Sequence, residues 1–264
     1  MKAWLSTRGL SAKYREQVES AGCVDFTKIR QEDVKRVVPG KSLDIDWTEV
    51  IFIKNIRGPK RSSFDTIVWS RTEGFYRTKV RPRMLLNRLA EDNGISWFDM
   101  TMFYRYLHLT GRVPFVIGPL MFIPTEVPKS RNHTSWIGGQ FVRHINEVAK
   151  TNGKPKVRID LANHMEMVIW DSEPRLRKSL TDAQAVLRLE QAEQAVRART
   201  NSVNASNDWL DAVSELYQLS KEIFAKEVLH KAGFDKEIKG ADIKRIVREI
   251  DRGNNDSLHL NDER

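Results

Sequence analysis

Apolar positions divide this 264-residue chain into a mixed first part and a helical last part. Near the amino terminus, two short amphipathic segments follow the N-cap residues Ser11 and Thr27, and they end at Gly22 and Gly40. Serine and threonine side chains accept hydrogen bonds from the first N–H groups of a helix, and glycine adopts the left-handed conformation at its end. We therefore predict a short helix in each segment.

The middle of the chain alternates short apolar runs with turn residues, which is typical of β-strands. Alternation of apolar with polar residues at 157–161, and of Met165, Met167 and Ile169 with Glu166, Val168 and Trp170 after the turn residues Asn163 and His164, predicts a hairpin with one buried face. Further strands are expected at residues 50–53, 64–69, 114–117, 120–123, 135–137 and 141–145.

Two more helices are predicted between these strands. Pro82 suits the first turn of a helix that runs to about Asp92, and apolar residues at helical spacing predict a second helix after Ser96. The pair has the outline of a helix-turn-helix, in which the second helix would read DNA. Ordinary packing of an α-helical hairpin explains the same pattern.

The last third of the chain has only helical periodicity. Thr181 and Gln184 form a capping box that opens the first of these helices. The predicted fold class is α+β: a mixed, largely antiparallel sheet region with flanking helices, followed by an all-helical C-terminal tail. The predicted domains are 1–53, with the N-terminal helices and first strand, 54–178, the basic α+β region, and 179–264, the helical region.

Charge adds a functional expectation because it is unevenly distributed. The chain carries a net charge of +9, whereas residues 181–264 alone are slightly acidic. Residues 54–88 hold ten Lys and Arg against two acidic residues, with aromatic residues among them. Like charges at this density repel one another unless a polyanion is bound. Nucleic acid is therefore the leading expected partner.

The cations of this stretch, with two from a later loop, are the candidate contacts to DNA. Guanidinium groups suit phosphate oxygens and base edges better than an ammonium does. The alternative for each residue is an ordinary solvated surface charge. The predicted DNA-binding residues are Arg57, Lys60, Arg61, Arg77, Lys79, Arg81, Arg83, Arg88, Lys129 and Arg131.

Motifs for catalysis and cofactor binding are missing from the sequence. The histidines lack metal-ligand spacing, and no phosphate-binding glycine loop or nucleophile elbow occurs, so we predict no enzyme activity, metal or cofactor. Asp160, His164 and Glu166 flank one hairpin turn, and a solvated loop explains them better than a metal site. Residues 251–262 have the outline of a calcium loop but lack its turn glycine.

The expected compartment follows from what the sequence lacks. Cys23 is the single cysteine, which excludes an intrachain disulfide. The first ten residues contain no continuous apolar segment, and no run of 18 apolar residues occurs. We expect a cytoplasmic protein with no membrane partner.

A family resemblance rests on three strings of residues. They are Val-Pro-Phe-Val-Ile from Val113, Leu-Met-Phe-Ile-Pro-Thr from Leu120 and Ser-Trp-Ile from Ser135. Their order and spacing resemble ComK, the bacterial competence transcription factor family, where a Lys-Pro-Pro-Ile-like strand precedes an aliphatic-Phe-x-Pro-Thr strand and a Trp-Ile pair. Gly-Ile-Ser-Trp from Gly94 falls where that family has Gly-Ser-Ser-Tyr. The family's following Gly-Arg is replaced here, and its paired prolines are reduced to Pro114.

The resemblance covers about residues 94–180 and implies a function. It implies an activator of competence, or DNA-uptake, genes that binds AT-rich promoter sites in double-stranded DNA as a homo-oligomer and acts with RNA polymerase. Two other classes stay open on the residues alone. One is a general nucleic-acid-binding accessory protein without sequence preference, and the other is a nucleic-acid-processing enzyme with a dispersed site.

Overall fold

The computed structural model describes residues 6–40, 43–56, 64–93, 97–125, 134–151, 153–162 and 165–200. The chain divides into two compact units. The first comprises Met1–Met100 with Leu109–Gln191, and the second comprises Thr101–His108 with Ala192–Arg264. Both β-sheets lie in the first unit, and the described fold has the predicted α+β class.

The larger sheet has six strands, and every neighbouring pair in it is antiparallel. Its spatial order is β4-β3-β2-β7-β6-β5, so β2 pairs with a strand about 80 residues later in the chain. In sequence order the strands are β2 (Val50–Asn55), β3 (Thr66–Ser70), β4 (Gly74–Thr78), β5 (Phe115–Ile117), β6 (Leu120–Thr125) and β7 (Ser135–Gly138).

The smaller sheet has four strands in the order β1-β10-β9-β8. A short 3-10 turn, η4 (Gly139–Phe141), leads the chain from the larger sheet into it. β1 is parallel to β10, and the other pairs are antiparallel, which confirms the predicted hairpin. Its strands are β1 (Cys23–Asp25), β8 (Val142–Thr151), β9 (Lys154–Leu161) and β10 (Glu166–Trp170).

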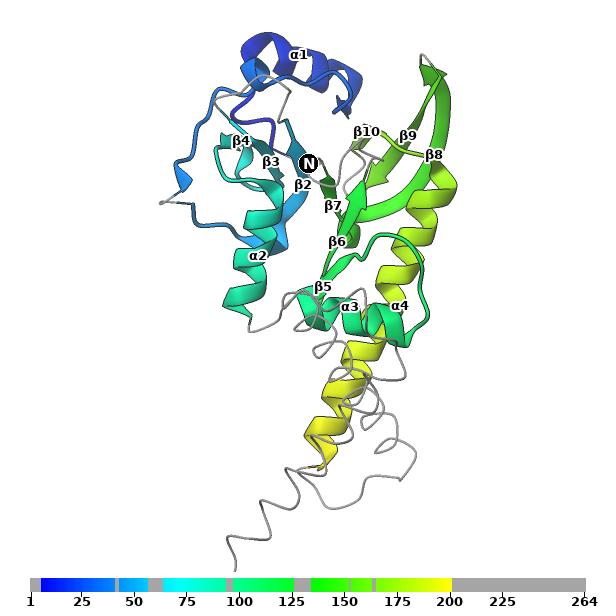
Figure 1. Cartoon of the computed structure of the whole chain (residues 1–264). Helices are drawn as coiled ribbons and strands as arrows, with labels where there is room; N and C mark the ends of the chain where they lie inside the picture. Colours follow the sequence, from blue (N-terminus) through cyan, green and yellow to red (C-terminus); the bar gives the residue numbers. More distant parts are fainter. Residues whose placement is uncertain are drawn as a thin grey trace, which may run out of the picture. The chain divides into compact units, whose positions relative to one another are not determined.

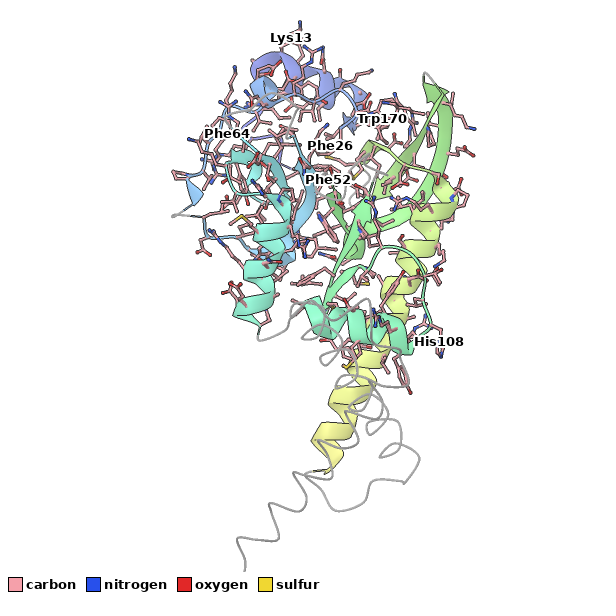
Figure 2. All side chains as sticks on the ribbon, viewed as in Figure 1. Lys13, Phe26, Phe52, Phe64, His108 and Trp170 are labelled. Carbon is pink, nitrogen blue, oxygen red and sulfur yellow. The ribbon has the colours of Figure 1, made fainter. Side chains whose placement is uncertain are left out.

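An aromatic cluster forms the core between the two sheets (Figure 2). Phe26 directly follows β1, and its ring centroid lies 4.4 Å from that of Phe52 and 5.6 Å from that of Trp69. Phe75 stacks on Trp69 at 5.2 Å. All four side chains are buried, so this cluster joins the smaller sheet to the larger one.

The described residues form four α-helices (Figure 1): α1 (Ala12–Ala21), α2 (Pro82–Asp92), α3 (Trp97–Tyr106) and α4 (Glu173–Thr200). The predicted caps of α1 are confirmed, because the Ser11 side chain accepts from the Tyr14 N–H and Gly22 has φ 63°. Two further 3-10 turns are η1 (Gln31–Asp33) and η3 (Trp47–Glu49). Among the described residues, no helix is long and apolar enough to cross a membrane.

The helix predicted after Thr27 is wrong. The Thr27 N–H donates to the Asp25 carboxylate, which forms a turn, and the segment beyond contains only the turn η1. Val34 forms an antiparallel bridge with Leu10. Pairing with a distant segment satisfies backbone groups that a helix would satisfy locally, so tertiary contacts override the local pattern.

The capping box predicted at Thr181 is also wrong, because α4 begins at Glu173 and runs through that position. Pro174 lies in the first turn, where its missing N–H leaves no hydrogen bond unmade. The predicted boundary 178/179 falls within α4, and the boundary 53/54 falls within β2. The predicted helices after residue 200 lie outside the described residues.

Candidate nucleic-acid interface

The predicted contact residues fall into three groups. Five of them lie outside the described residues: Arg57, Lys60, Arg61, Lys129 and Arg131. A second group makes hydrogen bonds or stacking contacts within the fold. The third group gathers at the start of α2.

Arg77 belongs to the second group. It lies half-buried on β4, a strand that the sequence pattern did not predict. Its Nη1 donates to the Gln31 carbonyl at 2.8 Å, and its guanidinium carbon lies 4.3 Å from the centroid of the Phe64 ring. These contacts hold the guanidinium within the fold, where it packs β4 against its neighbours.

Other cations of the basic stretch also have internal partners. The Lys54 ammonium donates to the main-chain carbonyl of Phe26, which ties β2 to the segment after β1. Arg71 forms a two-pronged ion pair with Glu49, and this pair raises the pKa of Arg71. The exposed Arg88 donates to the Gly40 carbonyl at 3.1 Å.

Lys79, Arg81 and Arg83 come together because burial alternates along the link between β4 and α2. Thr78, Val80 and Pro82 are buried, so the three cations between and after them are exposed. The Thr66 hydroxyl on β3 donates to the Val80 carbonyl at 2.5 Å, which holds the link between β4 and α2 against the larger sheet.

The start of α2 is electropositive for a second reason. Arg81 is the N-cap residue, and it provides no side-chain hydrogen bond to the free N–H groups of the first turn. That turn also contains no acidic residue. Asp65 contributes one carboxylate, 3.9 Å from the Arg81 Nε, and Arg81 remains 55% exposed. The helix dipole and three cations therefore produce a positive potential at one place.

One face of α2 is buried and the opposite face is exposed. Leu85, Leu86, Leu89 and Ala90 are buried, and α2 contacts β2 of the larger sheet. The opposite face exposes Met84 at 50%. The helix-turn-helix alternative stays a prediction, since the link between α2 and α3 lies outside the described residues.

The strings that carry the ComK resemblance meet in the larger sheet. Pro124 on β6 faces Trp136 on β7, and Ile123 faces Ile137. The Arg175 guanidinium on α4 donates to the Pro124 carbonyl at 3.2 Å. Ile123, Pro124, Trp136 and Ile137 are buried, so they belong to the core of the fold.

Two of the three residues considered for a metal site make contacts with other side chains, and the third lies outside the described residues. Asp160 accepts from Asn146 at 3.4 Å, Glu166 pairs with Arg158 at 3.4 Å, and His164 lies outside the described residues. Within the described ranges, no group of three metal-binding side chains occurs.

A further group of cations, which the sequence-based prediction did not include, lies on β8 and β9. A signal was present, since residues 148–158 contain four cations and no acidic residue around an Asn-Gly pair.

Comparisons with protein families, curated proteins and solved structures found no match for this chain.

Proposed function

We propose that this protein binds double-stranded DNA as a transcriptional regulator. The observation that carries the proposal is the cluster of Lys79, Arg81 and Arg83 at the uncapped start of α2. Helix N-termini bind phosphate because their free N–H groups and dipole both favour an anion. The adjacent cations add charge and, in the two arginines, a planar fork that fits phosphate oxygens.

The electrostatic balance within the protein supports the same partner. Arg81 forms an ion pair with Asp65, at the long separation of 3.9 Å between the Arg81 Nε and the carboxylate. Three cations and a helix N-terminus in one place repel each other, and a phosphate backbone relieves that repulsion. Binding to DNA is therefore expected to reduce the electrostatic repulsion among these cations.

The regulatory role rests on the family resemblance. It favours an activator of competence genes at AT-rich promoter sites, acting as a homo-oligomer with RNA polymerase. Arginines beside a duplex can enter a narrow minor groove, which AT-rich sequence provides. This physical preference agrees with the expectation from the resemblance.

A charge-reversal experiment tests the proposal. Lys79→Glu, Arg81→Glu and Arg83→Glu are combined in one variant, and Arg77 is left intact because it packs the fold. The matched control combines Lys13→Glu, Arg15→Glu and Lys28→Glu, which changes the net charge equally at three other exposed positions. Fluorescence anisotropy with AT-rich duplex, GC-rich duplex and RNA measures the affinities.

We expect the α2 variant to lose affinity for duplex DNA on the order of 100-fold at 0.1 M salt, since three phosphate contacts are removed. The control should lose far less. Equal losses in both variants would mean that only net charge matters and would refute the proposed interface. Equal affinity of the native protein for all three ligands would instead identify a general nucleic-acid binder.

A further inference from the structure

The β8–β9 hairpin is the second basic surface of the first unit. Thr151 is opposite Lys154, so the chain reverses within two residues, and the second of them, Gly153, has φ 72°. β10 ends opposite Lys156, which leaves the outer part of the hairpin two-stranded. Figure 1 shows this part extending beyond the end of β10. A two-stranded arm of this kind is accessible to a large partner.

The charge of the arm has one sign. Its outer part carries Lys150, Lys154 and Lys156, and residues 148–158 include no acidic residue. Lys150 and Lys154 are exposed. The carboxylates of Asp160 and Glu166 are at the other end of the strands, where Glu166 pairs with Arg158. The three lysines have no ion-pair partner in the described part of the chain.

An indole ring holds two of these lysines on one face of the sheet. Lys154 and Lys156 are two positions apart on β9, so they point to the same side. Their Nζ atoms lie 5.8 Å and 4.7 Å from the centroid of the Trp170 ring. Figure 2 places Trp170 on β10, beside the hairpin. The ring attracts both ammonium groups and limits their rotation, which prepares them for an anionic partner.

We infer that the β8–β9 hairpin is a second phosphate-contacting element, which adds sequence-independent affinity for the duplex that the proposed function requires. Lysine is a point charge without the fork that reads base edges, so these residues suit phosphate and not base recognition. Each phosphate contact contributes about 0.9 to the slope of log affinity against log salt. The arm is therefore expected to increase affinity and its salt dependence, and to leave sequence preference unchanged.

Lysine footprinting on the native protein tests this inference directly. Surface lysines are acetylated with and without AT-rich duplex, and the modified positions are measured by mass spectrometry. We expect DNA to protect Lys150, Lys154 and Lys156 at least several-fold, and to leave Lys13 on α1 unprotected. Figure 2 shows Lys13 at the surface of α1. A lack of protection on the hairpin would overturn the inference.

A variant with Lys150→Gln, Lys154→Gln and Lys156→Gln supplies the quantitative test. Its salt slope should fall by about 2.7 relative to the native protein, with an unchanged ratio of affinities for AT-rich and GC-rich duplex. The control is Lys13→Gln with Arg15→Gln and Lys28→Gln. An unchanged slope would overturn the inference, and a variant that in addition aggregates more would assign the lysines to protection of the edge strand β8, which carries Lys150.

The two proposals can fail separately. If the native protein binds duplex and only the α2 variant is impaired, the hairpin inference is wrong and the proposed function stands. If the native protein binds no duplex at all, the proposed function fails and the hairpin inference fails with it.

Discussion

Arg77 shows how a cation in a basic stretch can serve the fold instead of a partner. We predict that Arg77→Met lowers the free energy of unfolding by about 1–3 kcal/mol, because it leaves the Gln31 carbonyl without its donor and removes the stacking on Phe64. Urea denaturation measures the change. Lys79→Met, two residues away and exposed, should stay within about 0.5 kcal/mol. Equal stability of both variants would contradict the packing role of Arg77.

Cys23 gives a prediction that depends on pH. Burial, with the nearby Glu166 carboxylate, raises the pKa of the Cys23 thiol to about 11. The native thiol should therefore react with iodoacetamide at pH 8 roughly 100-fold more slowly than the same thiol in urea, because thiolate falls tenfold per pKa unit. Because the thiol pKa is higher in the folded than in the unfolded protein, its contribution to the free energy of unfolding is fully present below the ordinary pKa of a thiol. This contribution is lost as the pH rises from that value toward 11. Similar rates in buffer and urea would show that the thiol is solvated.

At the residue scale, sequence could identify a basic region but not the role of each cation. The alternation of burial that exposes Lys79, Arg81 and Arg83 can be predicted from the sequence once Pro82 is placed at the start of a helix. The structural role of Arg77 could not be predicted from the sequence, since it depends on Gln31, a residue 46 positions away. Lys54 is similar, because its acceptor is the carbonyl of Phe26 on a distant segment.

At the scale of elements, the start of α4 depends on a buried ion pair. The Asp171 side chain is 1% exposed, and it binds Arg175, which also donates to the Pro124 carbonyl. We predict that Asp171→Asn lowers the free energy of unfolding by about 3 kcal/mol, because it leaves a half-buried guanidinium without its counter-ion. Chemical denaturation followed by circular dichroism measures this loss.

The same helix turn supplies the control for that substitution. Glu173 pairs with Arg177 at the same spacing, with side chains 28% and 55% exposed. Glu173→Gln should therefore cost less than about 1 kcal/mol. If the two substitutions cost the same, burial of the Asp171 pair does not determine the stability of this helix start.

Elements with complete local signals were predictable from sequence. Pro82 and the apolar spacing behind it define α2, and Ser11 with Gly22 defines α1, within the observed bounds. The segment after Thr27 had the same local signals but a different structure, because its backbone pairs with residues near Leu10. Local caps predict a helix only where no distant strand competes for the same N–H and C=O groups.

At the scale of the whole molecule, net charge and guanidinium placement should control different properties of the proposed DNA complex. A net charge of +9 and two basic surfaces set the overall affinity and its decrease with salt. Sequence preference depends instead on which groups can enter a narrow minor groove. Guanidinium is more weakly hydrated than ammonium and enters that groove at a lower cost of desolvation.

The variant Arg81→Lys with Arg83→Lys separates these two properties because it keeps the charge. We predict an unchanged salt slope and a ratio of AT-rich to GC-rich affinity that falls toward one. Anisotropy titrations with duplexes of equal length, at four salt concentrations, measure both quantities in one series. A preserved ratio would place sequence recognition outside the start of α2. A reduced slope would show that the arginine fork itself, beyond its charge, sets the number of phosphates bound.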